Sequence, residues 1–386
     1  MIGVLEWSPA FRKYASITRP LEPSGQAFFK EVPVSNLKSS RVLWSAFLLT
    51  LVLIPFTYLL SASGNVQVNA EALQMFAPLP AVMSSPDNPV TDAKVTLGRI
   101  LYYDTRLSAD QKISCNTCHP LDAYGAESKS VSTGHKNQKG SRNAPTVYNA
   151  AGHFVQFWDG RAPNVEEQAK GPITNPVEMA MPSSAVAVQV IKSMPEYVKL
   201  FQTAFPNDKD PVTFNNMAMA IGAFERGLVT PSRWDAFVEG DRFALTDAEK
   251  SGFNTFASVG CQWCHYGPYV GGSVYQKLGV VKPWPNQTDQ GRYQLTKDEM
   301  DKMVFKVPSL RNIKKTGPYF HDGSVPTLDQ AIRNMAVHQR GVTLTNAQLK
   351  SIETWMESLT GQIPMSYIKP PELPKSTSQT PQPRSE

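Results

Sequence analysis

The chain has 386 residues, a formal net charge of +5 and only four cysteines. This length allows two or three domains with buried cores, whereas four cysteines are too few for a disulfide-stapled scaffold of this size. The small basic excess is scattered, without a run of five or more like charges, so the sequence argues against a nucleic-acid partner. Prolines outnumber glycines, 31 to 24, and predict long irregular connections between short helices.

An uncharged apolar segment occupies residues 42–60 and is long enough to cross a membrane as a helix. Six Lys or Arg residues precede it, and none follows it until Lys94. Because positive charge stays on the cytoplasmic side, residues 1–41 are predicted to be a cytoplasmic leader and everything after residue 60 to be exported. The segment is either an uncleaved anchor in the inner membrane or a cleaved signal segment, since residues 61–64 are small enough for a peptidase.

The exported part reads as mainly α-helical. Residues 61–90 are polar and proline-rich and are predicted to be a linker, and the Pro/Ser-rich tail at 364–386 is predicted to be disordered. Apolar residues at helical spacing predict helices at 91–103, 165–170, 183–205, 214–222, 246–259, 328–337 and 346–359. Alternating patterns are sparse, so strands should be few and short.

An internal repeat organises the exported part. The motif Cys-Asn-Thr-Cys-His at 115–119 recurs as Cys-Gln-Trp-Cys-His at 261–265. The segments at 145–149 and 157–160 are echoed at 308–312 and 320–323, in the same order. We therefore predict two homologous helical domains, at 91–232 and 233–363.

Both copies of the Cys-x-x-Cys-His motif point to covalent haem. The residues concerned are Cys115, Cys118 and His119 in the first copy and Cys261, Cys264 and His265 in the second. On a helix this spacing places both sulfurs and the imidazole on one face, so that two thioether bonds and one iron ligand serve a single porphyrin. A zinc site would need further ligands nearby, and a thioredoxin-like pair needs no histidine. The sequence predicts two haem c groups, each at the centre of a cytochrome c-like domain.

For the sixth ligand of each iron, the candidates are the remaining histidines (His135, His153, His321 and His338) and the methionines at loop or helix ends. His135 lies in a loop beside Gly134 that is able to approach a flat macrocycle, and Met335 lies on a helical stretch beyond the second motif. Met179 and Met181 are rival ligands on spacing alone.

The chain resembles the bacterial di-haem cytochrome c peroxidases over roughly residues 85–365. The matching blocks are Leu97–Asp104, Arg142–Thr146, Phe157–Arg161, Glu167–Gln168, Asn175–Met179, Tyr319–Gly323 and Met335. The resemblance implies His135 as the displaceable sixth ligand of the N-terminal, peroxidatic haem and Met335 as that of the C-terminal, electron-transfer haem. It further implies that Gln168 and Glu178 are distal catalytic residues and that Trp158 lies between the haems.

The same resemblance implies a calcium ion at the domain junction. Its expected ligands are the Asn143 side chain and the main-chain carbonyls of Thr316 and Pro318, and oxygen ligands of this kind suit calcium. The resemblance also implies a homodimer. Export and the attachment of haem outside the cytoplasm predict a periplasmic location. The segment at 281–292 is a loop to which the sequence assigns no role.

These expectations describe an oxidoreductase that reduces hydrogen peroxide to water. The electron donor would be a small redox protein, such as a cytochrome c or a copper protein, or membrane quinol chemistry. A first alternative is a di-haem oxidase of a protein tryptophan, as in methylamine utilisation; those enzymes carry a tyrosine where Met335 stands here. A second is a non-catalytic di-haem electron carrier, and a third is a structural metal-binding protein.

Overall fold

The computed structural model describes residues 66–384 of the chain. The predicted leader at 1–41 and the apolar segment at 42–60 lie outside the described residues. Within residues 66–384, no helix combines the length and apolar character that a membrane span requires. Residues 66–384 belong to one compact unit.

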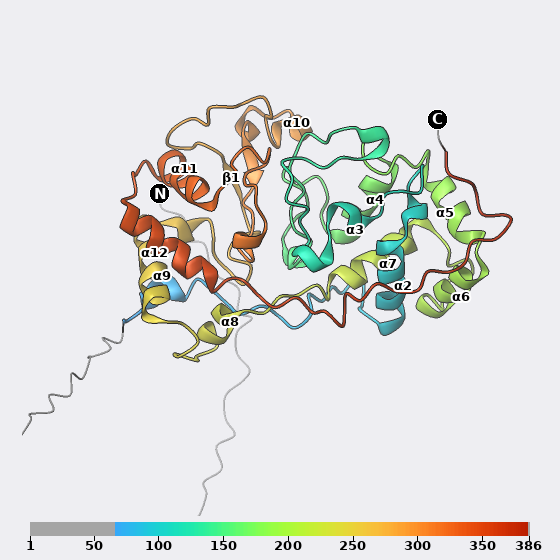
Figure 1. Ribbon diagram of the computed structural model, residues 1–386, viewed down its shortest axis with the longest axis horizontal. Coiled ribbons are helices and arrows are strands. Elements are labelled where there is room, and N and C mark those ends of the chain that lie inside the picture. The colour runs from blue at the N-terminus through green and yellow to red at the C-terminus, as the bar shows by residue number, and fades with distance from the viewer. Residues whose placement is uncertain (1–65, 385–386) are drawn as a thin grey trace, which may run out of the picture. The chain divides into compact units, whose positions relative to one another are not determined.

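The described part is mainly helical, as predicted (Figure 1). Its α-helices are α1 (Ala70–Leu73), α2 (Asp92–Tyr103), α3 (Cys115–Cys118), α4 (Val165–Thr174), α5 (Ser184–Lys192), α6 (Pro195–Ala204), α7 (Phe214–Glu225), α8 (Arg233–Val238), α9 (Asp247–Val259), α10 (Tyr293–Thr296), α11 (Leu328–Arg340) and α12 (Asn346–Glu357). Two short strands, β1 (Tyr275–Lys277) and β2 (Val304–Lys306), pair antiparallel with Tyr275 opposite Lys306.

One predicted helix, at 183–205, is two helices in the structure. The first ends at Lys192 and the second begins at Pro195. Proline has no N–H to donate and its ring clashes with the preceding turn, so it begins a new helix more readily than it continues an old one.

The first hydrophobic core lies among α2, α4, α5, α6 and α7. Leu97, Leu101, Phe201 and Ile221 are all fully buried there. Helices α2 and α7 touch closely at Gly98, where an added Cβ would stand 1.9 Å from the carbonyl oxygen of Ala220. Glycine is therefore required at this crossing.

The second core lies among α8, α9, α11 and α12 and is rich in aromatic residues. Trp234, Phe253 and Trp355 are fully buried, with ring centroids 5.0–5.5 Å apart. Gly252 on α9 provides the same kind of close approach, because its Cβ would lie 2.1 Å from the oxygen of Ser351 on α12.

The repeated blocks have the same backbone in both halves. Asn149 and Asn312 both adopt left-handed conformations, with φ of 60° and 61°, and Phe157 and Phe320 do likewise at 65° and 70°. Isolated antiparallel bridges recur at 156–162 and 319–325. The prediction of two homologous helical halves is confirmed, while the exact boundary at 232/233 stays a prediction.

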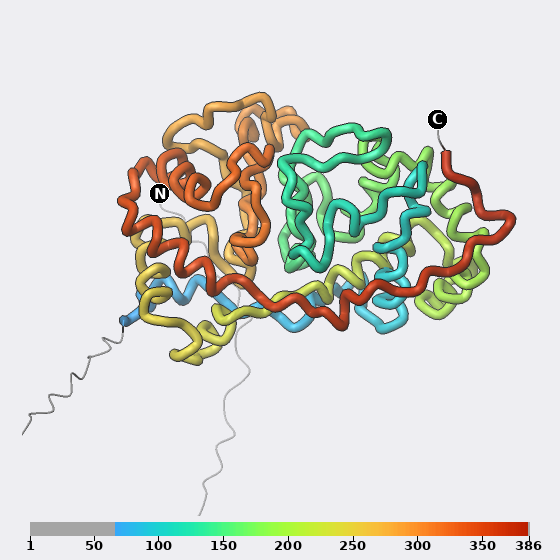
Figure 2. Tube along the Cα trace, viewed as in Figure 1, coloured from blue at the N-terminus to red at the C-terminus, as the bar shows by residue number. Residues whose placement is uncertain are grey.

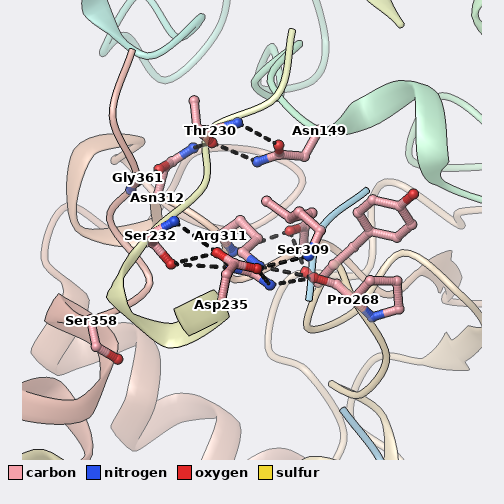
Figure 3. A network of polar contacts seen from close by, with 12 residues as sticks. Asn149, Thr230, Ser232, Asp235, Pro268, Ser309, Arg311, Asn312, Ser358 and Gly361 are labelled. Carbon is pink, nitrogen blue, oxygen red and sulfur yellow. Dashed lines mark hydrogen bonds and ion pairs between the residues drawn. The ribbon is translucent and has the colours of Figure 1, made fainter. Parts of the chain in front are cut away.

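The two asparagines of the repeat meet at the junction of the halves (Figure 3). Asn149 Nδ2 and Asn312 Nδ2 both donate to the hydroxyl oxygen of Thr230, at 2.8 and 2.9 Å. Asn149 Oδ1 also accepts from the Thr230 backbone N–H, and Asn312 Oδ1 accepts from that of Gly361. Because these groups are buried, their hydrogen bonds to Thr230 hold the segment that connects the two halves in place.

The linker prediction for 61–90 was wrong for the part that the structure describes. Ala72 and Phe76 are buried in the second core, where the Phe76 ring packs edge-on against Trp234 at 5.4 Å. Further along, the Asn88 amide donates to Glu166 Oε1 of the first domain at 2.8 Å. The segment is thus tied to the second half by apolar packing of Phe76 and to the first half by the buried Asn88 amide.

The disorder prediction for the tail was also wrong for residues 364–384. The tail leaves the second domain and follows the surface of the first, as the red trace in Figure 2 shows. The Tyr367 ring stacks on Phe224 at 5.2 Å, and the Tyr103 hydroxyl donates to the Ile368 carbonyl at 2.6 Å. Near the end, the Arg384 N–H donates to the Ala109 carbonyl. Composition suggested disorder, but side chains of the first domain bind the tail's backbone.

Replacement of Ile368 by Ala should therefore destabilise the protein by about 2–5 kcal/mol, since Ile368 is only 3% exposed. Thermal or urea unfolding of the holoprotein measures the loss. Leu373→Ala is the control on the same segment, because Leu373 is 40% exposed and its truncation should cost less than about 0.5 kcal/mol. Equal stability of the two variants would show that the tail contributes no packing energy.

Candidate functional site

Both Cys-x-x-Cys-His motifs sit on short helical turns. Cys115 and Cys118 are the ends of α3, whose start is closed by a reciprocal hydrogen-bond pair between Ser114 and Thr117. The second motif begins a 3₁₀ turn after Gly260, which adopts a φ of 85°. All four thiols are free and half-buried. Four unpaired thiols in two such pairs fit thioether attachment of two haems.

The imidazoles of the two motif histidines are in the neutral form that can ligate iron. Burial lowers the pKa of His119 and lowers that of His265 to about 4, so both imidazoles are neutral at pH 7. His119 Nδ1 lies 3.3 Å from the Gly125 carbonyl oxygen. A hydrogen bond there orients the ring and leaves Nε2 for the metal.

His135 is held on a tight loop beside Glu178. Its backbone N–H donates to the Glu178 carbonyl at 2.8 Å. Gly134 is required next to it, because a Cβ would stand 2.0 Å from the carbonyl oxygen of Val177. The His135 side chain is 8% exposed, its Nδ1 has no hydrogen-bond partner in the described chain, and Asp110 Oδ2 lies 3.6 Å away.

A cavity of about 250 Å³ lies beside this loop. Its lining residues are Phe157, Arg161, Ala162, Glu167, Gly171, Pro172, Asn175 and Glu178. Glu178 Oε1 accepts a hydrogen bond from Asn175 Nδ2 at 2.7 Å. Burial raises the pKa of Glu178, and this effect outweighs the opposing influence of the Arg161 charge and of the Asn175 hydrogen bond. The cavity therefore holds a carboxyl group with its pKa moved toward neutrality.

Gln168 does not line this cavity. Helix α4 lines the cavity with Glu167, Gly171 and Pro172. The Glu167 carboxylate is paired with Lys170 at 2.6 Å. Adjacent positions on a helix are turned by about 100° from each other, so Gln168 lies on a different face of α4 from Glu167. The role predicted for Gln168 stays a prediction.

Trp158 connects the loop of the first domain to the surroundings of Met335. Its Nε1 donates to the Asn143 carbonyl at 2.9 Å, and its own carbonyl accepts from the Lys306 N–H at 2.8 Å. Trp158 and Met335 pack against one apolar cluster that includes Trp284 and Phe305. The placement of Trp158 at this junction suits the bridging role that was predicted for it.

The rival ligands Met179 and Met181 belong to the first hydrophobic core. They are 3% and 5% exposed and lie among aliphatic side chains. Met335, on α11, is half-buried and packs against the apolar cluster that includes Trp284. The structure thus gives both rivals a packing role.

The structure shows how the side chain of Asn143, a predicted calcium ligand, is placed. The Asn143 amide nitrogen donates to the carbonyls of Lys129 and Ser130, at 2.9 and 3.3 Å. Within residues 66–384, no group of three or more His, Cys, Asp or Glu residues is arranged to hold a metal ion. Main-chain oxygens of Thr316 and Pro318 would have to supply most of the ligation, so the calcium ion remains a proposal.

An ion network that the sequence did not reveal ties the unassigned loop to the first domain. Arg142 binds Asp159 at 2.7 Å and binds both carboxylate oxygens of Asp289, at 2.6 and 2.8 Å. The loop is further held by buried Trp284 and by its Lys282 carbonyl, 2.8 Å from His338 Nδ1. Trp284, a large apolar residue among polar ones, is the feature of the sequence that could have indicated a packed loop.

Comparison with known proteins agrees with this arrangement. Residues 92–243 match the model of the di-haem cytochrome c peroxidase family. The chain is 44% identical to cytochrome c551 peroxidase of Nitrosomonas europaea over 83% of this chain and 92% of that protein. It is 41% identical to cytochrome c551 peroxidase of Pseudomonas aeruginosa, over 86% and 98%. Identity to the methylamine utilization protein MauG of Methylorubrum extorquens is lower, 32% over 70% of this chain and 79% of that protein.

Among solved structures, a MauG-like protein associated with microbial copper homeostasis superimposes with a TM-score of 0.67 at 27% identity, covering 76% of this chain and 97% of that one. The family implies two haem c groups, which the two free Cys-x-x-Cys-His motifs fit. The described chain, from its paired helical halves to its haem-binding motifs, therefore belongs to the di-haem cytochrome c peroxidases, a family of oxidoreductases.

Proposed function

We propose that the N-terminal domain reduces hydrogen peroxide to two waters. The reaction consumes two protons, and a small redox protein supplies the two electrons. The observation that carries this proposal is the buried Glu178 carboxyl, which has a raised pKa and lies on a cavity beside the His135 loop. When bound, the haems supply a coordination position for peroxide and store electrons. The protein must open that position and move a proton.

Glu178 is the group that moves the proton. Asn175 Nδ2 donates a hydrogen bond to Glu178 Oε1 at 2.7 Å, which leaves Oε2 to carry the proton. Oε2 would take a proton from the peroxide oxygen nearer the iron and deliver it to the oxygen farther from the iron. Water then leaves in place of hydroxide. The cavity, of about 250 Å³, has room for peroxide and a few waters beside the Glu178 carboxyl.

With a haem bound, His135 would hold the sixth position, and its loop is the part of the chain that would move to open the site. Its loop contains left-handed residues at Lys136 and Asn137, and only 3.6 Å separates its Nδ1 from Asp110. A carboxylate near the ring is positioned to receive a hydrogen bond from the released imidazole. The trigger would be electron arrival at the C-terminal, Met335-ligated centre, with Trp158 between the two.

Stopped-flow mixing of peroxide with fully oxidised and with half-reduced holoenzyme tests the switch. We expect rapid turnover only after half-reduction, together with spectral release of the His135 ligand. His135→Gly should be active in both forms, because the sixth position is then open from the start. Equal turnover by both forms of the unaltered enzyme would contradict the switch.

The proposal also includes the partners and the location of the protein. A cytochrome c or a copper protein suits the role of donor, calcium at Asn143, Thr316 and Pro318 would brace the junction, and a homodimer follows the family resemblance. A periplasmic location agrees with covalent haem attachment and with the asymmetry of charge around residues 42–60. If it is not cleaved, the segment at 42–60 would anchor the protein to the inner membrane.

The alternative of a MauG-type tryptophan oxidase is disfavoured by Met335 and by the lower identity to MauG. A plain electron carrier would not use a buried carboxyl on a cavity. Peroxide consumption with reduced cytochrome c as donor separates both alternatives from the peroxidase.

A further inference from the structure

Lys306, the last residue of β2, is buried without a carboxylate partner. It is 6% exposed, and no carboxylate in residues 66–384 forms an ion pair with its Nζ. Its backbone N–H is bound to the Trp158 carbonyl, so the residue lies at the junction beside the proposed bridge. Removing an ammonium group from water without a counter-charge costs roughly several kcal/mol, so buried ammonium groups are usually paired or neutral.

The contact made by Nζ is to a histidine of the other half. Lys306 Nζ lies 3.2 Å from His153 Nδ1. The ammonium can only donate, so Nδ1 accepts and the imidazole hydrogen is on Nε2. Nε2 is itself shielded from water and has no hydrogen-bond partner in the described chain. This cluster consequently has more donors than acceptors, and it lacks an anion.

The cluster lies next to the turn that supports His265. Gly272 donates its N–H to the Val307 carbonyl, one residue beyond Lys306, and a Cβ on Gly272 would stand 2.3 Å from His153 Cδ2. A Cβ on the adjacent Gly271 would stand 3.2 Å from His265 Nδ1. The two glycines thus allow His265 and His153, the partner of Lys306, both to pack closely against one turn.

We propose that Lys306, oriented by His153, binds a propionate carboxylate of the C-terminal haem. Thioether attachment uses the vinyl groups of the porphyrin and leaves two propionates to be accommodated, and a buried cation without a carboxylate is matched to one of them. Burial alone lowers the pKa of Lys306 to about 8, and an adjacent carboxylate would restore its charge. The positive charge then favours the reduced haem, which helps the C-terminal centre accept electrons.

The test is Lys306→Met in the holoenzyme, read by spectroelectrochemical titration of both haems and by resonance Raman bands of the propionates. This inference rests on the two haems of the proposed function but not on Glu178, and both readings are independent of peroxide turnover. We expect a lower reduction potential for the C-terminal haem and a shifted propionate band, with the N-terminal haem much less affected. Lys306→Arg should retain the potential.

The matched control is Lys302→Met, which removes the same charge nearby from a side chain that is 41% exposed and paired with Glu299. Screening by solvent should leave its potentials as in the unaltered enzyme. If Lys306→Met and Lys302→Met give the same potentials and bands, the assignment is overturned. A shift confined to the N-terminal haem would overturn it equally.

Two further measurements complete the test. Lys306→Gln removes the charge but keeps a donor, and it replaces the methionine variant if that variant does not fold. Titration of the unaltered enzyme with acetate distinguishes a propionate from a free carboxylate. We expect no effect of acetate, whereas a saturable change in the C-terminal potential would show that the site takes an anion from solution and would refute the propionate assignment.

Discussion

Glu178→Gln should lower peroxide turnover by about 10²- to 10⁴-fold, the usual contribution of a positioned acid–base group. The amide keeps the size and the hydrogen bond to Asn175 but cannot take a proton, so proton transfer to the far oxygen of peroxide is lost. Absorption spectra of both haems should be unchanged, because Glu178 does not ligate iron. Stopped-flow turnover of half-reduced holoenzyme measures the effect.

The matched control is Glu167→Gln, which alters the other carboxylate on the same cavity. Glu167 is half-exposed and paired with Lys170, so its loss should cost less than about tenfold. Turnover of Glu178→Gln close to that of the unaltered enzyme would refute the assignment. A large loss in Glu167→Gln instead would transfer the role to that residue.

The pH dependence should reveal the same group. Burial raises the pKa of Glu178, and the carboxylate form is the one that accepts a proton. Activity should therefore fall as pH drops through this raised pKa, at a higher pH than for an ordinary glutamate. This acid limb should be missing from the residual activity of the glutamine variant.

Arg311→Met should destabilise the protein by about 3–5 kcal/mol, because it leaves Asp235 as an unpaired buried charge. The two side chains are 1% and 8% exposed and are joined by two hydrogen bonds, at 2.7 and 2.8 Å (Figure 3). Arg311 also donates to the Pro268 carbonyl, close to the second haem-binding motif. Unfolding of the holoprotein, followed by circular dichroism, measures the loss.

An exposed pair provides the comparison. Arg333 and Asp329 are 37% and 45% exposed, so Arg333→Met should cost no more than about 1 kcal/mol. Addition of Asp235→Asn to Arg311→Met should recover part of the stability, since the unpaired charge is then removed. If the two arginine variants were equally stable, the buried pair would contribute no more to stability than the exposed one.

The haem attachment sites and the helical halves could be read from the sequence because both depend on local spacing. Three residues at i, i+3 and i+4 lie on one helical face in any surrounding, and α2, α9 and α12 follow apolar periodicity closely. The repeat was visible for the same reason, since the left-handed Asn149 and Asn312 recur with their neighbours.

The segments that were misjudged depend on distant partners. The tail at 364–384 is polar in composition, yet Phe224, Tyr103 and Ala109 hold it. Residues 66–90 looked like a linker, yet Phe76 completes a core built from residues far along the chain. The composition of a segment does not reveal contacts with residues that are far away in the sequence.

The sequence by itself determined the chemistry: two haem-binding motifs, two related halves and a block of candidate residues around Glu178. Only the tertiary structure decided that Glu167 rather than Gln168 faces the cavity, that Asp289 binds Arg142, and that Lys306 meets His153 without an anion. Motif chemistry is local and is set by residue type and spacing. Burial, orientation and pairing of charge arise only when segments more than a hundred residues apart pack together, and these properties determine pKa and access.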